Sequence, residues 1–344
     1  MTSYKVRDLL EFLSVMTGGR TVMDTNPANW ENNPFVMIKS SEIPGKEILE
    51  IPGLVYGDPE APIRRIALTI TLTENRLELA GAIGVNVILV HHPVADAASS
   101  GGVPLRVYAS LYDLNIIELH EAFHGLHPGI RFLHGFSPEW VELNYGGILG
   151  NVVSVGTPLP GVHTLGDILK RLDEYMGLGT EQAVLAAETK IRGIPSMEET
   201  AVAARPYILL GRPESPVRKI LHFAPHGGFE AAHLDQCLAD NPEIDTVVSS
   251  FSRPSPDGPL VRRAKEHGLN LLVGNCHVSE VYENWLPMAK ALEMALPGVD
   301  LVVFHERVTA TPAAEFGNEK IRAYAREMAE KHLVKVGVPS GGRG

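Results

Sequence analysis

The sequence predicts an α/β fold with two pseudo-repeated βαβαβ lobes, mainly parallel sheets and a linking region. Two observations predict it. From Arg65 onward, short apolar runs rich in β-branched residues alternate with helical segments of about ten residues, which is typical of βαβ units. The same order of elements also occurs twice, and the spacing from His92 to His120 nearly equals that from Ser250 to His277.

The chain divides into four predicted segments. Apolar residues from Val6 to Met16 recur at helical spacing, so residues 1–60 form an N-terminal extension with one helix. The other three segments are a first α/β lobe at 61–127, a linking lobe at 128–215 and a second α/β lobe at 216–344. Strands are expected at 64–72, 85–93 and 115–124, and again at 218–225, 244–254 and 270–280. Similar order alone does not decide between true duplication and two unrelated segments of the same kind.

Composition excludes several classes of protein. A chain of 344 residues with 44% hydrophobic content can bury a large core. Its formal charge of −11 argues against nucleic acid as a partner, because a phosphate backbone binder needs a basic face. No apolar run approaches the ~20 residues of a membrane span, and the N-terminal segment lacks the apolar core of a signal peptide, so we expect a cytoplasmic protein. Two cysteines exclude a disulfide framework.

Histidines cluster at the predicted strand ends. In open parallel sheets, ligands gather at the carboxyl ends of the strands, where these side chains would converge. His91 and His92 end one strand directly before Pro93, and at a strand terminus both rings can reach one cavity. Imidazole is the commonest nitrogen ligand for transition metals, so the pair predicts a metal site, which we expect in the cleft between the two lobes. Any one of these histidines could instead hydrogen-bond a nearby carbonyl.

Two further strand ends offer one imidazole and one carboxylate each. Glu121 and His124 follow one strand, and His277 and Glu280 follow another. Carboxylates can bridge two cations, as two-metal hydrolytic sites require. Glu121 could equally be a solvated carboxylate at a strand end.

Four segments resemble the Nif-three-like family, whose members are often labelled dinuclear metal-centre proteins or GTP cyclohydrolase I type 2. These segments are GLVYGDPEAPIRRI, GVNVILVHHP, LPGVHTLGDILKRLDEYMG and GLNLLVGNCHVSE, and the resemblance covers roughly residues 53–307. It implies a two-lobed α/β fold and toroidal hexamers. It also implies two metal ions held by a double histidine, an aspartate and a His/Glu pair.

The resemblance assigns ligands to positions in this chain. His91 and His92 match the double histidine, and Glu280 matches the glutamate. His124 stands where the family has the aspartate, which removes a negative charge and a bridging atom and leaves open whether one ion or two is bound. Either His277 or Cys276 takes the remaining ligand position. The expected cofactor is one or two divalent ions of Zn, Fe, Mn, Ni or Co.

The predicted function is metal-dependent hydrolysis of a C–N or phosphoester bond in a small molecule. A metal-activated water would attack, and Glu121 or His120 would shuttle the proton. The alternatives are a non-catalytic metal-binding or assembly protein and a metal-free structural protein. The expected partners are a small-molecule substrate and further copies of the chain, with no nucleic acid and no membrane; the hexamer is implied by the resemblance.

Overall fold

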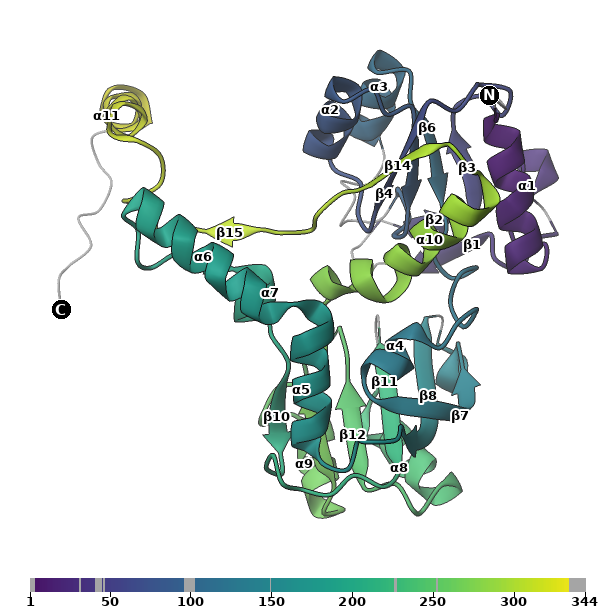
Figure 1. Ribbon diagram of the computed structural model, residues 1–344, viewed down its shortest axis with the longest axis vertical. Coiled ribbons are helices and arrows are strands. Elements are labelled where there is room, and N and C mark those ends of the chain that lie inside the picture. The colour runs from purple at the N-terminus through teal and green to yellow at the C-terminus, as the bar shows by residue number, and fades with distance from the viewer. Residues whose placement is uncertain are drawn as a thin grey trace. The chain divides into compact units, whose positions relative to one another are not determined.

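The computed structural model describes residues 4–30, 32–40, 45, 47–95, 103–148, 150–225, 228–251 and 253–333. It confirms the α/β class, with two large sheets whose central strands are parallel (Figure 1). The chain divides into two compact units. Unit 1 consists of Met1–Gly177 and Ala204–Glu306, and unit 2 of Leu178–Ala203 and Arg307–Gly344.

The first sheet of unit 1 has five strands in the order β14-β4-β5-β6-β3. The first four are parallel, and β3 pairs with β6 in the antiparallel direction. The strands are β3 (Gly53–Tyr56), β4 (Arg65–Thr69), β5 (Val87–Val90), β6 (Asn115–Glu118) and β14 (Asp300–Val303). Four of them follow one another along the first third of the chain, whereas β14 comes from its C-terminal third.

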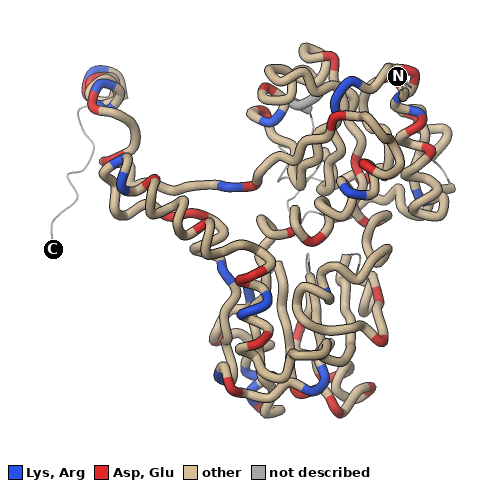
Figure 2. Tube along the Cα trace, viewed as in Figure 1, with Lys and Arg blue, Asp and Glu red and all other residues tan. Residues whose placement is uncertain are grey.

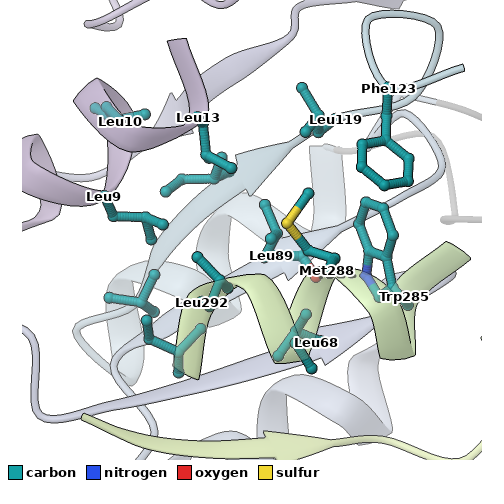
Figure 3. Packing of buried hydrophobic residues seen from close by; sticks show 14 of the residues in the cluster. Leu9, Leu10, Leu13, Leu68, Leu89, Leu119, Phe123, Trp285, Met288 and Leu292 are labelled. Atoms are coloured by element: carbon teal, nitrogen blue, oxygen red, sulfur yellow. Dashed lines mark hydrogen bonds between the residues drawn. The ribbon is translucent and has the colours of Figure 1, made fainter. Parts of the chain in front are cut away.

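Alternate residues of this sheet face two different helical layers. Leu68 and Leu89 pack with helices α1 and α10, as Figure 3 shows, whereas Ala67 and Ile88 belong to a second cluster that includes residues of α2 and α3. The strands are therefore buried on both faces, which explains their continuous apolar sequences. The helices are α1 (Val6–Thr17), α2 (Glu74–Ala82), α3 (Val103–Leu111) and α10 (Leu286–Ala295).

The second sheet has six strands in the order β10-β13-β12-β11-β8-β7. Its three central strands β11, β12 and β13 are parallel, and the outer three are antiparallel to their neighbours. Leu234 of α8 and Val261 of α9 pack on one face. The strands are β7 (Phe136–Glu142), β8 (Asn151–Pro158), β10 (Tyr207–Leu210), β11 (Ile220–Pro225), β12 (Thr246–Ser249) and β13 (Asn270–Val273). The helices are α4 (Gly129–Leu133), α5 (Leu165–Met176), α8 (Ala231–Asp240) and α9 (Pro259–Glu266).

The predicted repeat is present as β4-α2-β5-α3-β6 and β11-α8-β12-α9-β13, but its register differs from the one that the sequence spacing suggested. His91 N donates to Thr69 O (3.0 Å), and Ser250 N donates to Phe223 O (3.1 Å) at the same place in the second copy. Ser250 is therefore equivalent to His91, not to His92. The backbone pairing of the third strand in each copy can be aligned in the same way. His120 is then equivalent to Asn275, and His277 lies two residues after Asn275.

The third strand of the second copy is shorter than predicted. It ends at Val273, and a 3-10 turn at His277–Ser279 and a π-helical turn at Val281–Trp285 lead into α10. Val281 and Trp285 are buried in the core of the first sheet, and Figure 3 shows Trp285 there. The chain thus leaves the second sheet and returns to the first one at this point.

The remaining elements are short or belong to unit 2. Unit 2 pairs β9 with β15, and the Arg307 guanidinium lies 2.8 Å from a Glu188 carboxylate oxygen. Its elements are α6 (Leu178–Arg192), β9 (Glu198–Glu199), α7 (Thr200–Ala203), β15 (Thr309–Ala310), α11 (Glu319–Met328) and a π-helical turn (Ala329–Leu333). In unit 1, β1 (Met37–Ser40) and β2 (Glu47–Glu50) form a hairpin, and 3-10 turns occur at Pro27–Asn29 and Tyr145–Gly147.

The sequence argues against a basic face for nucleic acid and against a membrane span. Figure 2 shows acidic and basic positions interspersed along the trace. Within the described ranges, no helix combines the length and the apolar character that crossing a membrane requires. The boundaries of the four predicted segments stay a prediction.

Candidate metal centre

The seven residues singled out from the sequence lie together at the carboxyl ends of the first sheet. Their nitrogen and oxygen ligand atoms form four overlapping groups, and within each group these atoms lie within 4.8 Å of one another. The groups are His91, His92 and His120; His91, His124 and Glu280; His92, His277 and Glu280; and His120, Glu121 and His124. All are buried except His277, which is partly exposed. These clusters could hold a metal ion.

His91 is fixed in one tautomer. Its Nδ1 lies 3.0 Å from Leu119 O, and because a carbonyl oxygen only accepts, Nδ1 must carry the proton. In a neutral ring Nε2 then presents a lone pair, and it lies 2.9 Å from Glu280 Oε1. This is the usual arrangement of a metal-ligating histidine, which donates its other ring nitrogen to a backbone carbonyl.

The charges of this pair favour a proton or a metal ion between the two side chains. Burial lowers the pKa of His91, although the nearby Glu280 opposes that effect, so the neutral imidazole is favoured. Burial would raise the pKa of Glu280, but His91, His277 and His92 outweigh it and hold this pKa well below its usual range. A lone pair and a carboxylate oxygen that face each other repel unless a proton or a metal ion lies between them.

Distances around Glu280 fit a common ion. Two ligands bound at about 2.1 Å to one ion lie about 3.0 to 3.6 Å apart when the angle between them is about 90° to 120°. Oε2 of Glu280 lies 3.6 Å from Nε2 of His92 and 3.5 Å from Nδ1 of His277. The donor set of imidazoles and one carboxylate is suited to Zn, Fe, Mn, Ni or Co.

Glu121 organises the other side of the cluster. Its carboxylate lies 3.0 Å from Nδ1 of His124 and 3.6 Å from Nδ1 of His120. Burial acts to lower the pKa of His124, but Glu121, Glu280 and Glu50 together outweigh it and raise this pKa. The charged imidazole is thus favoured at His124, in contrast to His91.

Glu50 is a member of this cluster that the sequence analysis missed. It is fully buried at the end of β2, accepts a hydrogen bond from Glu121 N (2.7 Å) and lies 3.3 Å from Nδ1 of His120. The signal in the sequence is one acidic residue inside the apolar segment ILEIPG, just before a Pro-Gly pair. A single carboxylate of this kind did not stand out among 41 acidic residues.

Two residues of the π-helical turn Val281–Trp285 contact the candidate ligands. The indole of Trp285 packs against His91, with ring centroids 4.6 Å apart, and donates Nε1–H to Leu89 O (3.2 Å). The amide of Asn284 donates to Glu280 Oε1 (3.0 Å). Both side chains fix the orientation of the residue that they contact.

The choice between His277 and Cys276 now has a geometric basis. His277 belongs to a group with His92 and Glu280, and its ring stacks on Phe251 with centroids 5.0 Å apart. The Cys276 thiol lies 3.9 Å from Ser279 Oγ and is in none of the four groups of the described chain. Of the two residues, His277 is thus the one that lies within a candidate metal-binding group of the described chain.

Comparisons with known proteins agree with the resemblance seen in the sequence. The family model described as Duf34/NIF3 (NGG1p interacting factor 3) matches residues 39–99, a segment that includes His91 and His92. No curated protein matches the chain by sequence.

Solved structures share the fold of nearly the whole chain. Reduced HcgD from Methanocaldococcus jannaschii is 13% identical with a TM-score of 0.54, over 88% of this chain and 98% of its own. Hypothetical protein SA1388 from Staphylococcus aureus is 14% identical with a TM-score of 0.51, over 87% and 96%. Protein ybgI, of unknown function, is 13% identical with a TM-score of 0.51, over 88% and 98%.

The chain is therefore an α/β protein that shares the fold of these structures and carries a buried His/Glu cluster. The family model thus agrees with the resemblance over residues 39–99, and the solved structures agree with the predicted fold over nearly the whole chain.

Proposed function

We propose that the chain is a metal-dependent hydrolase that acts on a C–N or phosphoester bond of a small molecule. The observation that carries this proposal is the contact between Nε2 of His91 and the Glu280 carboxylate, two acceptors that a metal ion can join when the imidazole is neutral. His91, His92, His124, His277 and Glu280 are the proposed ligands, for one or two ions.

A bound divalent ion would lower the pKa of a water molecule and so supply a nucleophile at neutral pH. The chain's own contribution is proton handling. Glu121 lies between His120 and His124, so its carboxylate can take a proton and pass it to the His120 ring. Glu50 accepts a hydrogen bond from the backbone of Glu121 and lies beside His120, so it positions both groups.

The test combines metal analysis with turnover of a panel of phosphoesters and cyclic amidines. We expect one or two equivalents of a transition metal, activity that a chelator removes and the metal restores, and loss of both metal and activity in His91→Ala. Glu121→Gln should keep at least one ion and reduce turnover by about 100-fold or more, because it removes a proton acceptor. A purified protein without any bound metal would contradict the proposal.

Burial favours a second candidate, a non-catalytic metal-binding or assembly protein. The side chains of His91, Glu280 and Glu121 are at most 5% exposed, which leaves a substrate little access to the cluster. Under this alternative, His91→Ala would lose the metal, yet no substrate of the panel would be turned over by the wild type. We also propose, from the family resemblance, a cytoplasmic homo-oligomer, with a hexamer as the expected form.

A further inference from the structure

A second cluster of buried polar side chains lies on the second sheet. Arg131 of α4, His127 just before that helix, and His222 of β11 line a small cavity of about 20 Å³. Val152 and Phe251 contribute apolar walls to it. A cavity of this size holds about one water-sized group.

Arg131 has no counter-charge within this cluster. Its side chain is buried, and Nε donates to Ser154 Oγ over a long 3.4 Å. Nη2 is buried without a hydrogen-bond partner, and among the residues that the structure describes no Asp or Glu forms an ion pair with this guanidinium. Burial lowers the pKa of Arg131 to about 10, against the opposing effect of Glu283, so the group stays charged at neutral pH. An isolated buried charge is strongly unfavourable.

Glu283 does not supply the missing negative charge. Its Oε1 accepts a hydrogen bond from the Asn275 amide (2.8 Å), and burial raises the pKa of this carboxyl well above its usual range. Burial therefore favours the neutral form of the Glu283 carboxyl over the carboxylate that would balance Arg131.

The two histidines add donors to the same cavity lining. Nδ1 of His127 accepts a hydrogen bond from Gly129 N (3.0 Å), so in the neutral ring Nε2 carries the proton, and this Nε2 is buried without a partner. Nε2 of His222 lies 2.7 Å from Ser250 Oγ. When the hydroxyl donates in that bond, Nδ1 of His222 carries a proton, and Nδ1 also has no partner.

We propose that this cavity binds an anion: chloride, or one oxygen of a carboxylate or phosphate group. One permanent cation and two imidazole nitrogens without partners, Nε2 of His127 and Nδ1 of His222, surround a space that fits a single such atom. His124 of the metal cluster lines the same cavity, so an anionic group held there would lie next to that cluster. This proposal is independent of the hydrolase proposal, because it requires neither a bound metal nor turnover.

The test is thermal unfolding of the full chain in a bulky sulfonate buffer at constant ionic strength, with sodium chloride, acetate or phosphate added. At least one of the three should raise Tm by about 3 °C or more near saturation. The anion that raises Tm shows whether the site takes chloride, a carboxylate oxygen or a phosphate oxygen. The response should persist after dialysis against a chelator, which separates this site from anion binding to a metal.

Three variants decide whether the cavity is responsible. Arg131→Met should abolish the rise in Tm on adding anion. Without added anion, its Tm should be no lower than that of the wild type, because an uncompensated charge has been removed. His127→Phe keeps the charge and should reduce the response. Arg64→Met, at an exposed arginine, should leave it unchanged.

Three outcomes would overturn the proposal. They are a wild type that responds to none of the three anions, a response that survives in Arg131→Met, and an Arg131→Met protein that is destabilised equally in every buffer. Broadening of the chloride NMR signal by the wild type, absent in Arg131→Met, provides a measurement that does not depend on unfolding.

Discussion

The two βαβαβ repeats have the same backbone plan and different chemistry at their strand ends. After the middle strand, the first repeat places His91 and His92 where the second places Ser250 and Phe251. After the third strand, His120 stands where the second repeat has Asn275. The equivalent positions are thus imidazoles in one copy and uncharged groups in the other.

This difference teaches that strand ends provide a place for ligands but do not by themselves make a metal site. Among its described residues, the second repeat contributes His277 and Glu280 to the candidate metal centre, and both lie beyond its last strand, where the chain returns to the first sheet. The strand ends of the second repeat instead lie at the cavity of Arg131, where an arginine, rather than a carboxylate, is the charged group. One repeat is suited to a cation, and the other to an anion.

The largest expected effect compares two buried aromatic residues. Trp285→Ala and Phe223→Ala should each lower the free energy of unfolding by about 3–5 kcal/mol, because both leave a cavity in a packed core. Only Trp285→Ala should also weaken metal binding, since Trp285 packs against His91, whereas Phe223 stacks on Phe229 with centroids 4.2 Å apart. Urea unfolding and metal titration check both. Equal metal affinity in the two variants would contradict the supporting role of Trp285.

The next effect is a pH dependence of His134, whose ring packs against His222 of the second cluster with centroids 5.3 Å apart. Burial lowers the pKa of His134 from 6.5 to about 4. Between these values the unfolded chain binds more protons than the folded protein, so this contribution is complete above pH 6.5 and is lost as the pH falls toward 4. It should amount to about 3 kcal/mol and should be absent in His134→Gln.

The sign of this effect distinguishes the two clusters. The pKa of His124 is raised, so its contribution is present below pH 6.5 and is lost as the pH rises through the folded-state value. Unfolding free energies of metal-free wild type, His134→Gln and His124→Gln across pH 4–8 should therefore diverge in opposite directions. A parallel course of all three curves would refute the assigned directions.

A smaller effect separates two acids that lie three residues apart. Glu280 is held ionised and Glu283 neutral, so Gln mimics the native charge state only at position 283. Glu280→Gln should weaken metal binding by about 100-fold, or about 2.8 kcal/mol, while Glu283→Gln should change it little. Competition with a chromophoric chelator measures both, and equal losses would remove Glu280 from the ligand set.

The smallest effect tests the equivalent of His91 in the second repeat. Ser250→Ala removes the hydrogen bond to His222 and should lower the free energy of unfolding by about 1 kcal/mol with unchanged metal content. His91→Ala, at the matching position, should lose the metal. Metal loss in Ser250→Ala would show that the two strand ends are coupled.

Local patterns predicted the strands and much of the site. The apolar runs that end at His91 and at Glu118 are buried on both sides, and their polar ends converge as open parallel sheets require. Glu50 could not be found in this way, because it reaches His120 across 70 residues and carries no motif of its own. Likewise, no local pattern shows that β14 pairs with β4 or that Arg131 is buried without a counter-charge.

The return of the chain to the first sheet has a consequence for the order of synthesis. His91 and Glu280 are separated by 189 residues, and β14, the edge strand beside β4, is made later still. On the ribosome, the histidines of the first repeat emerge long before the carboxylate that joins them, and the second sheet is complete in between. The polar cluster of the first sheet must therefore remain exposed to solvent until the last third of the chain has been translated.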